Sequence, residues 1–168
     1  EEPLAAALGA GLDIRRPMGT MVVDIGGGTA DIAVVTMGSI SISKSVKIAG
    51  NILDEDIIRY LRRERNIVIG EKTAESIKKR IGCAYLRDTE LAIGIKGKHY
   101  ITGMPITDEV NTTEIYLAMR EHLEAIAEGV RSVLEVTPPE LAGDISETGI
   151  LLTGGGALLD GMDKLIEK

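Results

Sequence analysis

The chain has 168 residues and a formal net charge of -7, from 26 acidic and 19 basic side chains. This acidity, together with an aromatic content of only 2%, argues against a nucleic-acid-binding surface built from phosphate contacts and stacked bases. The single cysteine, Cys83, excludes an internal disulfide and fits a cytoplasmic location. The apolar runs are far shorter than the roughly 20 residues that cross a bilayer, so we expect no direct membrane insertion from this segment.

The first part of the chain predicts one helix followed by three strands. A helix is expected over residues 1–11, because Pro3 favours a first helical turn and glycines follow the apolar stretch. Buried strands are expected at 21–25 and 31–37, where the residues are almost all apolar, and these two should pair as a hairpin. The alternation of Ile and Val with Ser and Lys over 40–48 predicts a third strand with one exposed face.

The middle of the chain predicts two amphipathic helices, at about 51–66 and 72–81, because apolar residues recur there at helical spacing. The segment 91–103 then predicts a hairpin that turns at Gly97. These elements differ in character from the strands before them. We therefore expect a small α+β insertion.

The last third predicts a long helix over 112–136, which Pro138 and Pro139 terminate. A helical turn at 139–143, a strand at 149–153 and a final amphipathic helix that contains Leu158 should follow. The chain as a whole predicts an α/β fold interrupted by an insertion.

The most informative motif is the glycine turn between the first two strands. Asp24 stands near the end of a buried strand, Gly26, Gly27 and Gly28 form the turn, and Thr29 begins the next strand. Glycines let backbone N–H groups approach a polyphosphate, the Thr29 hydroxyl is suited to donate to a phosphate oxygen, and Asp24 is suited to hold a hydrated Mg²⁺ or orient a water. The alternative is a plain hairpin turn with a satisfied aspartate.

A second glycine triplet follows the predicted strand at 149–153. Gly154, Gly155 and Gly156 lead through Ala157 and Leu158 into the last helix, so their N–H groups are suited to face an adenosine or a phosphate oxygen. The pattern is neither a Walker loop nor a GxGxxG fingerprint. An ordinary glycine-rich turn is the alternative.

Two further places carry groups suited to a nucleotide site. Glu2 precedes Pro3 at a helix start, where local sequence favours a capping role over the polarisation of a water. Glu75 and Lys78 lie three residues apart on a helix and could meet a ribose hydroxyl and a base edge. A solvated ion pair is the ordinary explanation for that spacing.

Together these segments resemble the MreB family of bacterial actins. The resemblance rests on EEPLAAALGAG, MVVDIGGGTADIAVV, GEKTAESIK and PPELAGDISETGILLTGGGALLDGMDKLI, and it spans essentially the whole chain. It implies an actin-like ATPase lobe of the ribonuclease H-like kind, with an inserted small α+β subdomain. Residues 1–50 and 107–168 would form subdomain IIA, with a connecting helix at 1–11, and residues 51–106 would form subdomain IIB. The earlier lobe of the family has no counterpart in this chain.

The resemblance also implies a set of site residues. Glu2 and Thr29 would help to position the attacking water, and Asp24 would lie near Mg²⁺ through a water. One departure from many relatives is Ala30, where they carry a second threonine. ATP or ADP contacts would come from Gly26, Gly27, Gly28, Thr29, Glu75, Ser76, Ile77, Lys78, Gly154, Gly155, Gly156, Ala157 and Leu158.

The function that the resemblance implies is that of an ATP-binding, filament-forming protein that organises cell-wall synthesis and maintains rod shape. Its partners would be further copies of itself along a protofilament and a membrane-anchored cytoskeletal adaptor on subdomain IIA. It would be cytoplasmic and reach the membrane through the complete protein or its partners. Because an actin-type nucleotide is clamped between two lobes, we expect this lobe alone to bind ATP weakly and to hydrolyse it negligibly.

Two other functions stay open at this point. One is an ATPase or kinase lobe of the wider superfamily that joins actins, chaperone ATPases and sugar kinases. The other is a protein-interaction module whose cleft residues are idle.

Overall fold

The computed structural model of the chain describes residues 2–168, with side chains from Pro3 onward. These residues divide into two compact units. The first unit contains the residues up to Gly50 together with Ala125–Ala157, and the second contains Asn51–Glu124 together with Leu158–Lys168.

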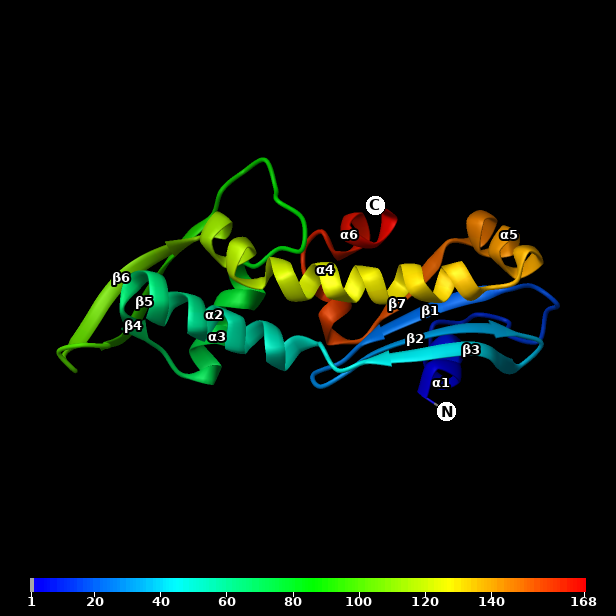
Figure 1. The fold of residues 1–168 in the computed structure, drawn as a ribbon, viewed down its shortest axis with the longest axis horizontal. Coiled ribbons are helices and arrows are strands. Elements are labelled where there is room, and N and C mark those ends of the chain that lie inside the picture. The colour runs from blue at the N-terminus through cyan, green and yellow to red at the C-terminus, as the bar shows by residue number, and fades with distance from the viewer. Residues whose placement is uncertain (1) are drawn as a thin grey trace. The chain divides into compact units, whose positions relative to one another are not determined.

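The first unit is built on a four-stranded sheet with the order β3-β2-β1-β7 (Figure 1). β1 (Thr20–Ile25) pairs antiparallel with β2 (Ala30–Thr36), which confirms the predicted hairpin. β3 (Ser39–Val46) extends the meander, and β7 (Ile150–Thr153) returns from far along the chain to lie parallel to β1. The parallel pair makes both glycine triplets follow strands that end at the same edge of the sheet.

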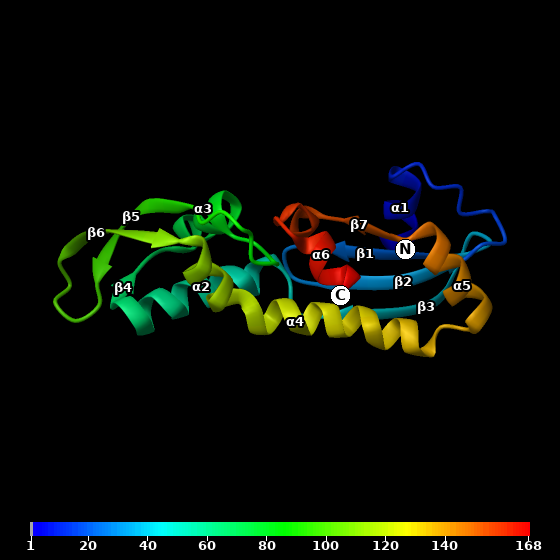
Figure 2. The ribbon, with the colours of Figure 1, turned by 90° about the horizontal axis from the view of Figure 1, so that it is seen from above.

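Helices cover both faces of this sheet (Figure 2). α1 (Glu2–Gly9) packs Ala7 against Val22 and Val35 in one buried cluster. On the opposite face, the later turns of α4 (Thr112–Val136) approach so closely that a Cβ on Gly129 would lie 2.9 Å from Val46 Cγ2. α5 (Pro139–Thr148) is tied to the start of β1, because Asp144 Oδ2 accepts from the Gly19 N–H at 2.7 Å.

β3 contains a bulge that the sequence pattern does not reveal. Val34 pairs with Ile42 and the adjacent Val35 pairs with Ile40, so Ser41 is the extra residue on β3. The two isoleucines therefore lie on opposite faces, and Ile40 packs with the α1 cluster. The prediction of a single apolar face along this strand was wrong, because alternation holds only while the register is unbroken.

The second unit contains a three-stranded sheet with the order β4-β5-β6. β4 (Ile67–Val68) is short, and β5 (Ala92–His99) and β6 (Pro105–Asn111) form a hairpin. The pairing of β6 with β5 continues to Asn111, so the boundary expected after residue 106 falls inside a continuous strand.

The helices of the second unit are α2 (Gly50–Arg65), α3 (Glu71–Ile81) and α6 (Met162–Glu167). Their apolar residues form its core, which confirms the predicted helical spacing. The 3₁₀ turn η1 (Gly155–Leu158) precedes α6, so the predicted final helix is two separate elements. The buried side chains are Leu53, Ile57 and Leu61 on α2, Ala74, Ile77 and Ile81 on α3, and Met162 and Leu165 on α6.

Two polar links join α2 to the first half of α4. Asp56, only 5% exposed, contacts His122 at 2.7 Å between Oδ2 and Nδ1, and burial raises the pKa of its carboxyl. Arg65 binds Glu114 on α4 at 2.5 Å and also binds Asp108 on β6 at 2.7 Å. These contacts satisfy charged groups that lie partly out of water.

The start of the long helix is set by a reciprocal cap. Asn111 Oδ1 accepts from the Glu114 N–H at 2.9 Å, and Glu114 Oε2 accepts from the Asn111 N–H at 3.1 Å. This is the arrangement of a capping box, which satisfies two backbone donors at a helix start. The helix over 112–136 was predicted with the bounds that the structure shows.

The predicted turn at Gly97 was wrong. Gly97 lies inside β5, and the chain turns between His99 and Pro105. A Cβ on Gly97 would lie 2.6 Å from the Val68 carbonyl oxygen, so the glycine is needed because β4 lies against it. The two-residue β4 was not predicted, since so short a strand has no period of its own.

We predict that Gly97→Ala destabilises the chain by about 1–3 kcal/mol, because the methyl group would force β4 away from β5. Denaturant unfolding followed by circular dichroism measures the change. Gly94→Ala in the same strand is the matched control, since no described residue other than its chain neighbours lies within 4 Å of its Cβ position. Its effect should stay within about 0.5 kcal/mol. Equal losses in the two variants would contradict the steric explanation.

Candidate functional site

The first glycine loop leaves the end of β1 and is held by its own backbone. The Gly26 N–H donates to the Thr29 carbonyl oxygen at 2.9 Å, and the Gly26 carbonyl accepts from the Gly50 N–H at 3.1 Å. Gly27, Gly28 and Thr29 are exposed at the tip, and apart from its chain neighbours no described residue comes within 4 Å of a Cβ on Gly28. The loop is therefore anchored at its base and accessible at its tip, as a loop that receives an anion must be.

The second glycine loop lies directly against the end of β1. Gly154 has a φ of +83°, and a Cβ there would lie 2.5 Å from Asp24 Oδ1 and still closer to the Ile25 carbonyl oxygen. A Cβ on Gly156 would lie 2.8 Å from Ile25 Cβ. Only glycine permits this contact, so the structure brings the two loops together around Asp24 and Ile25.

A row of polar side chains crosses the sheet at this edge. Asp24 pairs with Asp31 on β2 and with Thr153 on β7, and Asp31 pairs with Ser45 on β3. Directly paired residues place their side chains on the same face, so these four groups lie on one face, which is also that of Val22 and α1. Two carboxylates and two hydroxyls are thus aligned.

Asp31 is a candidate site residue that sequence reasoning missed. Its Oδ2 accepts a hydrogen bond from the Thr29 hydroxyl at 2.8 Å, so the hydroxyl expected to donate to phosphate is held by a neighbouring carboxylate. The signal in the sequence was the placement of Asp24 and Asp31 on either side of the turn. Residues so placed become partners when the hairpin closes.

A pocket of about 790 Å³ opens along the same face of the first unit. Pro3 and Leu4 of α1 line one side, and Asp31, Ser43 and Ser45 are among the residues on the other. The polar row is therefore partly accessible to solvent and not sealed under α1. The side chain of Glu2, for which a role beside Thr29 was expected, lies outside the described part of the chain.

The residues expected to contact the nucleoside have separate partners in the second unit. Glu75 is exposed and binds Lys79 at 2.6 Å, and this hydrogen bond lowers the pKa of the Glu75 carboxyl. Lys78 binds Asp54 on α2 at 2.8 Å, so the ion-pair partners of Lys78 and Glu75 are different residues. Ser76 is exposed, whereas Ile77 is 2% exposed and belongs to the core, so only its backbone is open to a ligand role.

Leu158 lies at the end of η1 and is 87% exposed. This is the largest exposed fraction among the large apolar side chains of the described residues, and the side chain offers a surface for a flat apolar group. Ala157 is half-buried, and its N–H donates to the Gly154 carbonyl at 3.2 Å, which closes the loop into a tight turn.

The oxygen groups around Asp24 fit Mg²⁺ held through water. Mg²⁺ keeps several waters and takes one or two carboxylates, which matches Asp24 and Asp31 at one sheet edge. Within residues 2–168, three or more His, Cys, Asp or Glu side chains nowhere gather as a metal cluster. In the same described range, every helix is too short or too polar to cross a membrane.

A comparison with known protein families matches residues 1–168 to the model described as MreB/Mbl protein. The chain belongs to the MreB/Mbl family. Among its MreB/Mbl relatives, the cell shape-determining protein Mbl of Bacillus subtilis is 48% identical over 166 residues, which cover 99% of this chain and 50% of Mbl. The chain thus spans about half the length of that relative.

Solved structures of MreB and of a more distant protein show the same fold. MreB5 of Spiroplasma citri bound to AMPPNP is 45% identical, with a TM-score of 0.94 over 98% of this chain and 49% of MreB5. The ADP-bound form of MreB5 matches equally well. The MamK double helical filament, at 22% identity, has a TM-score of 0.76 over 99% of this chain and 49% of MamK. The fold is therefore an actin-like α/β lobe, as the sequence predicted.

We predict that Gly154→Ala destabilises this MreB/Mbl lobe by about 2–4 kcal/mol, because the new Cβ adds left-handed backbone strain to a clash with β1. Thermal and denaturant unfolding measure the loss. Gly155→Ala is the matched control, since among the described residues only its chain neighbours come within 4 Å of its Cβ position. A Gly154 variant as stable as the Gly155 variant would show that the loop does not lie against Asp24 and Ile25.

Proposed function

We propose that this chain is the nucleotide-binding second lobe of an MreB-type filament protein that maintains cell shape. The observation that carries the proposal is the meeting of two glycine loops around Asp24, because this leaves backbone N–H groups and a carboxylate at one sheet edge. The AMPPNP- and ADP-bound structures of MreB5, a 45% identical relative, support ATP or ADP as the ligand.

The phosphate end of the nucleotide belongs at the first loop. The N–H groups of Gly27 and Gly28 hold the phosphate oxygens, and Asp24 holds Mg²⁺ through a water. Gly26 lies at the base of the loop, where its N–H is bound to the Thr29 carbonyl oxygen. When bound, Mg²⁺ supplies positive charge that offsets the charge of the phosphates. Asp31 orients the Thr29 hydroxyl through their 2.8 Å hydrogen bond.

The nucleoside end belongs at the second loop and α3. Gly154, Gly155 and Gly156 allow close approach of the adenosine, and the exposed Leu158 offers an apolar contact. The polar contacts to the ribose and adenine side come from Glu75 and Lys78, with Ser76 and the backbone of Ile77 beside them. Glu2 helps to position the attacking water in the complete protein.

The complete protein would be a filament former with slow ATP hydrolysis. The filament structure of MamK, which shares the fold, supports self-association into protofilaments. A membrane-anchored cytoskeletal adaptor on subdomain IIA and a role in organising cell-wall synthesis complete the proposal. The protein would work in the cytoplasm at the inner face of the membrane.

The lobe alone should bind nucleotide weakly and hydrolyse it negligibly. The polyphosphate would meet backbone dipoles and one hydrated metal, whereas phosphoryl transfer requires more charge neutralisation and positioning. We expect millimolar affinity, which corresponds to only about 4 kcal/mol of binding free energy.

The test is a titration of the ¹⁵N-labelled chain with Mg²⁺-ATP, followed by the amide resonances of Gly26–Thr29. We predict saturable shifts there, and a loss of affinity of about tenfold or more in Asp24→Asn, because the metal loses its anionic support. Asp13→Asn, an exposed aspartate of the same unit, is the control and should bind as the parent does.

Three results would count against the proposal. Tight, Mg²⁺-dependent binding or measurable turnover would contradict the weak single-lobe site. Equal affinities of the Asp24 and Asp13 variants would remove Asp24 from the site. If Mg²⁺-ATP shifts no resonance of Gly26–Thr29 at millimolar concentration, the alternative of a protein-interaction module with an idle cleft is favoured.

A further inference from the structure

The ion pair between Lys78 and Asp54 joins α3 to α2 and is more buried than the Lys79–Glu75 pair on α3. The two side chains are 14% and 15% exposed, and their charged atoms are 2.8 Å apart. The Lys79–Glu75 pair on α3 is 69% and 48% exposed, and the Arg63–Glu64 pair on α2 is 73% and 46% exposed. Lys78 is therefore the one lysine of α3 in the described residues that is held against another helix by a mostly buried partner.

Stability alone does not explain this pair. Removing two charges from water costs about as much free energy as their attraction returns, so an apolar pair of similar size would serve the core as well. Asp54 Oδ1 is buried and has no hydrogen bond among the described residues, which leaves the Lys78 ammonium to offset its charge. The arrangement fixes where the ammonium sits.

The pair also sets the charge of this part of α3. An unpaired ammonium attracts phosphate strongly, whereas an ammonium paired with a carboxylate belongs to a pair with little net charge and still donates hydrogen bonds. Lys79 is balanced in the same way by Glu75 at 2.6 Å. The charge of each of the two consecutive lysines is thus offset by a carboxylate, which suits an uncharged ribose or base and not a phosphate.

We propose that Asp54 is a positioning residue that holds and neutralises Lys78, so that Lys78 donates to an uncharged group of the nucleoside and does not compete for the phosphates. This inference rests on the proposed nucleotide-binding function and adds the residue that orients the nucleotide. Asp54 acts through Lys78 and need not touch the nucleotide itself. Its removal should therefore change which ligand α3 prefers.

The experiment compares two small probes, adenosine and pyrophosphate, each titrated into the ¹⁵N-labelled chain while the amides of Glu75–Lys78 are followed. In Asp54→Asn we expect the affinity for adenosine to fall about tenfold, the value of one hydrogen bond to a charged group. The affinity of the chain for pyrophosphate, followed at the same amides, should rise. A merely structural role would weaken both probes together.

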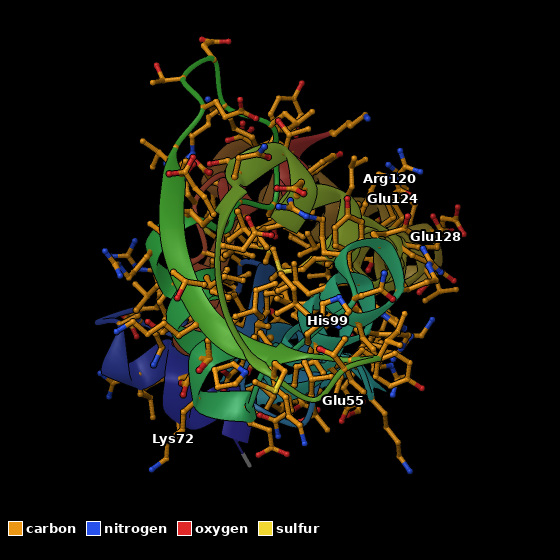
Figure 3. All side chains as sticks on the ribbon, turned by 90° about the vertical axis from the view of Figure 1, so that its left-hand side faces the viewer. Glu55, Lys72, His99, Arg120, Glu124 and Glu128 are labelled. Carbon is orange, nitrogen blue, oxygen red and sulfur yellow. The ribbon has the colours of Figure 1, made fainter. Side chains whose placement is uncertain are left out.

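Glu55→Gln is the matched control. Glu55 is the next residue on α2, its side chain is exposed on the outer surface of the helix, and the substitution removes the same charge (Figure 3). Its ratio of adenosine to pyrophosphate affinity should equal that of the parent chain. A change as large as that of Asp54→Asn would overturn the proposal, because net charge would then be the cause.

A double-mutant cycle gives a second test, because it compares Asp54→Asn in the presence and in the absence of the Lys78 ammonium. Lys78→Met removes the ammonium and keeps an unbranched side chain. We expect it to lower the affinity for adenosine to the same extent as Asp54→Asn does. Adding Asp54→Asn to Lys78→Met should then change adenosine affinity no further. A further loss would show that Asp54 acts independently of Lys78 and would overturn the proposal.

The two titrations distinguish a failure of the role proposed for Asp54 from a failure of the proposed nucleotide-binding function. If Mg²⁺-ATP fails to shift Gly26–Thr29 in the parent chain, the nucleotide site itself is wrong. If Mg²⁺-ATP does shift that loop, but adenosine leaves the α3 amides unmoved or Asp54→Asn keeps the parent's ratio, only the role of Asp54 is overturned.

Discussion

The contact of the second glycine loop with the end of β1 is the constraint on which the first unit depends. β7 joins the sheet from a distant part of the sequence, and it pairs parallel to β1 over residues 150–153. The loop that follows must turn immediately across Asp24 and Ile25, where no side chain fits at Gly154 or Gly156. The approach of bare glycine backbone to Asp24 and Ile25 therefore both closes the sheet edge and builds the candidate site.

This constraint explains why the site can be accessible without being loose. The first loop is pinned by backbone hydrogen bonds at Gly26, and the second is pinned by steric contact with Ile25. The side chains that remain at the edge are polar and short, so they are oriented by strand register and not by long flexible stems. A ligand would meet groups whose positions are already set, which reduces the ordering cost of binding.

Local patterns in the sequence predicted the elements whose signals are local. The long helix, the first hairpin and the two glycine loops carry periodicity or composition within a few residues, and they were found. Gly97 was misread because its role depends on the neighbouring Val68 carbonyl, and Ile40 because its face depends on a bulge. The partnership of Asp54 with Lys78 was invisible for the same reason, since it exists only once α2 and α3 pack.

The register between β1 and β2 links the position of the candidate site residues to the stability of the core. Asp24 and Asp31 lie on the same face because their strands pair residue by residue, and the opposite face is the apolar one that meets α4. A slip of one residue in β2 would turn Asp31 into that apolar layer, where an unpaired carboxylate costs several kcal/mol. A chain with a misaligned site would therefore also have a damaged core. Cellular quality control that recognises unstable chains would therefore also remove the chains in which the site is misaligned.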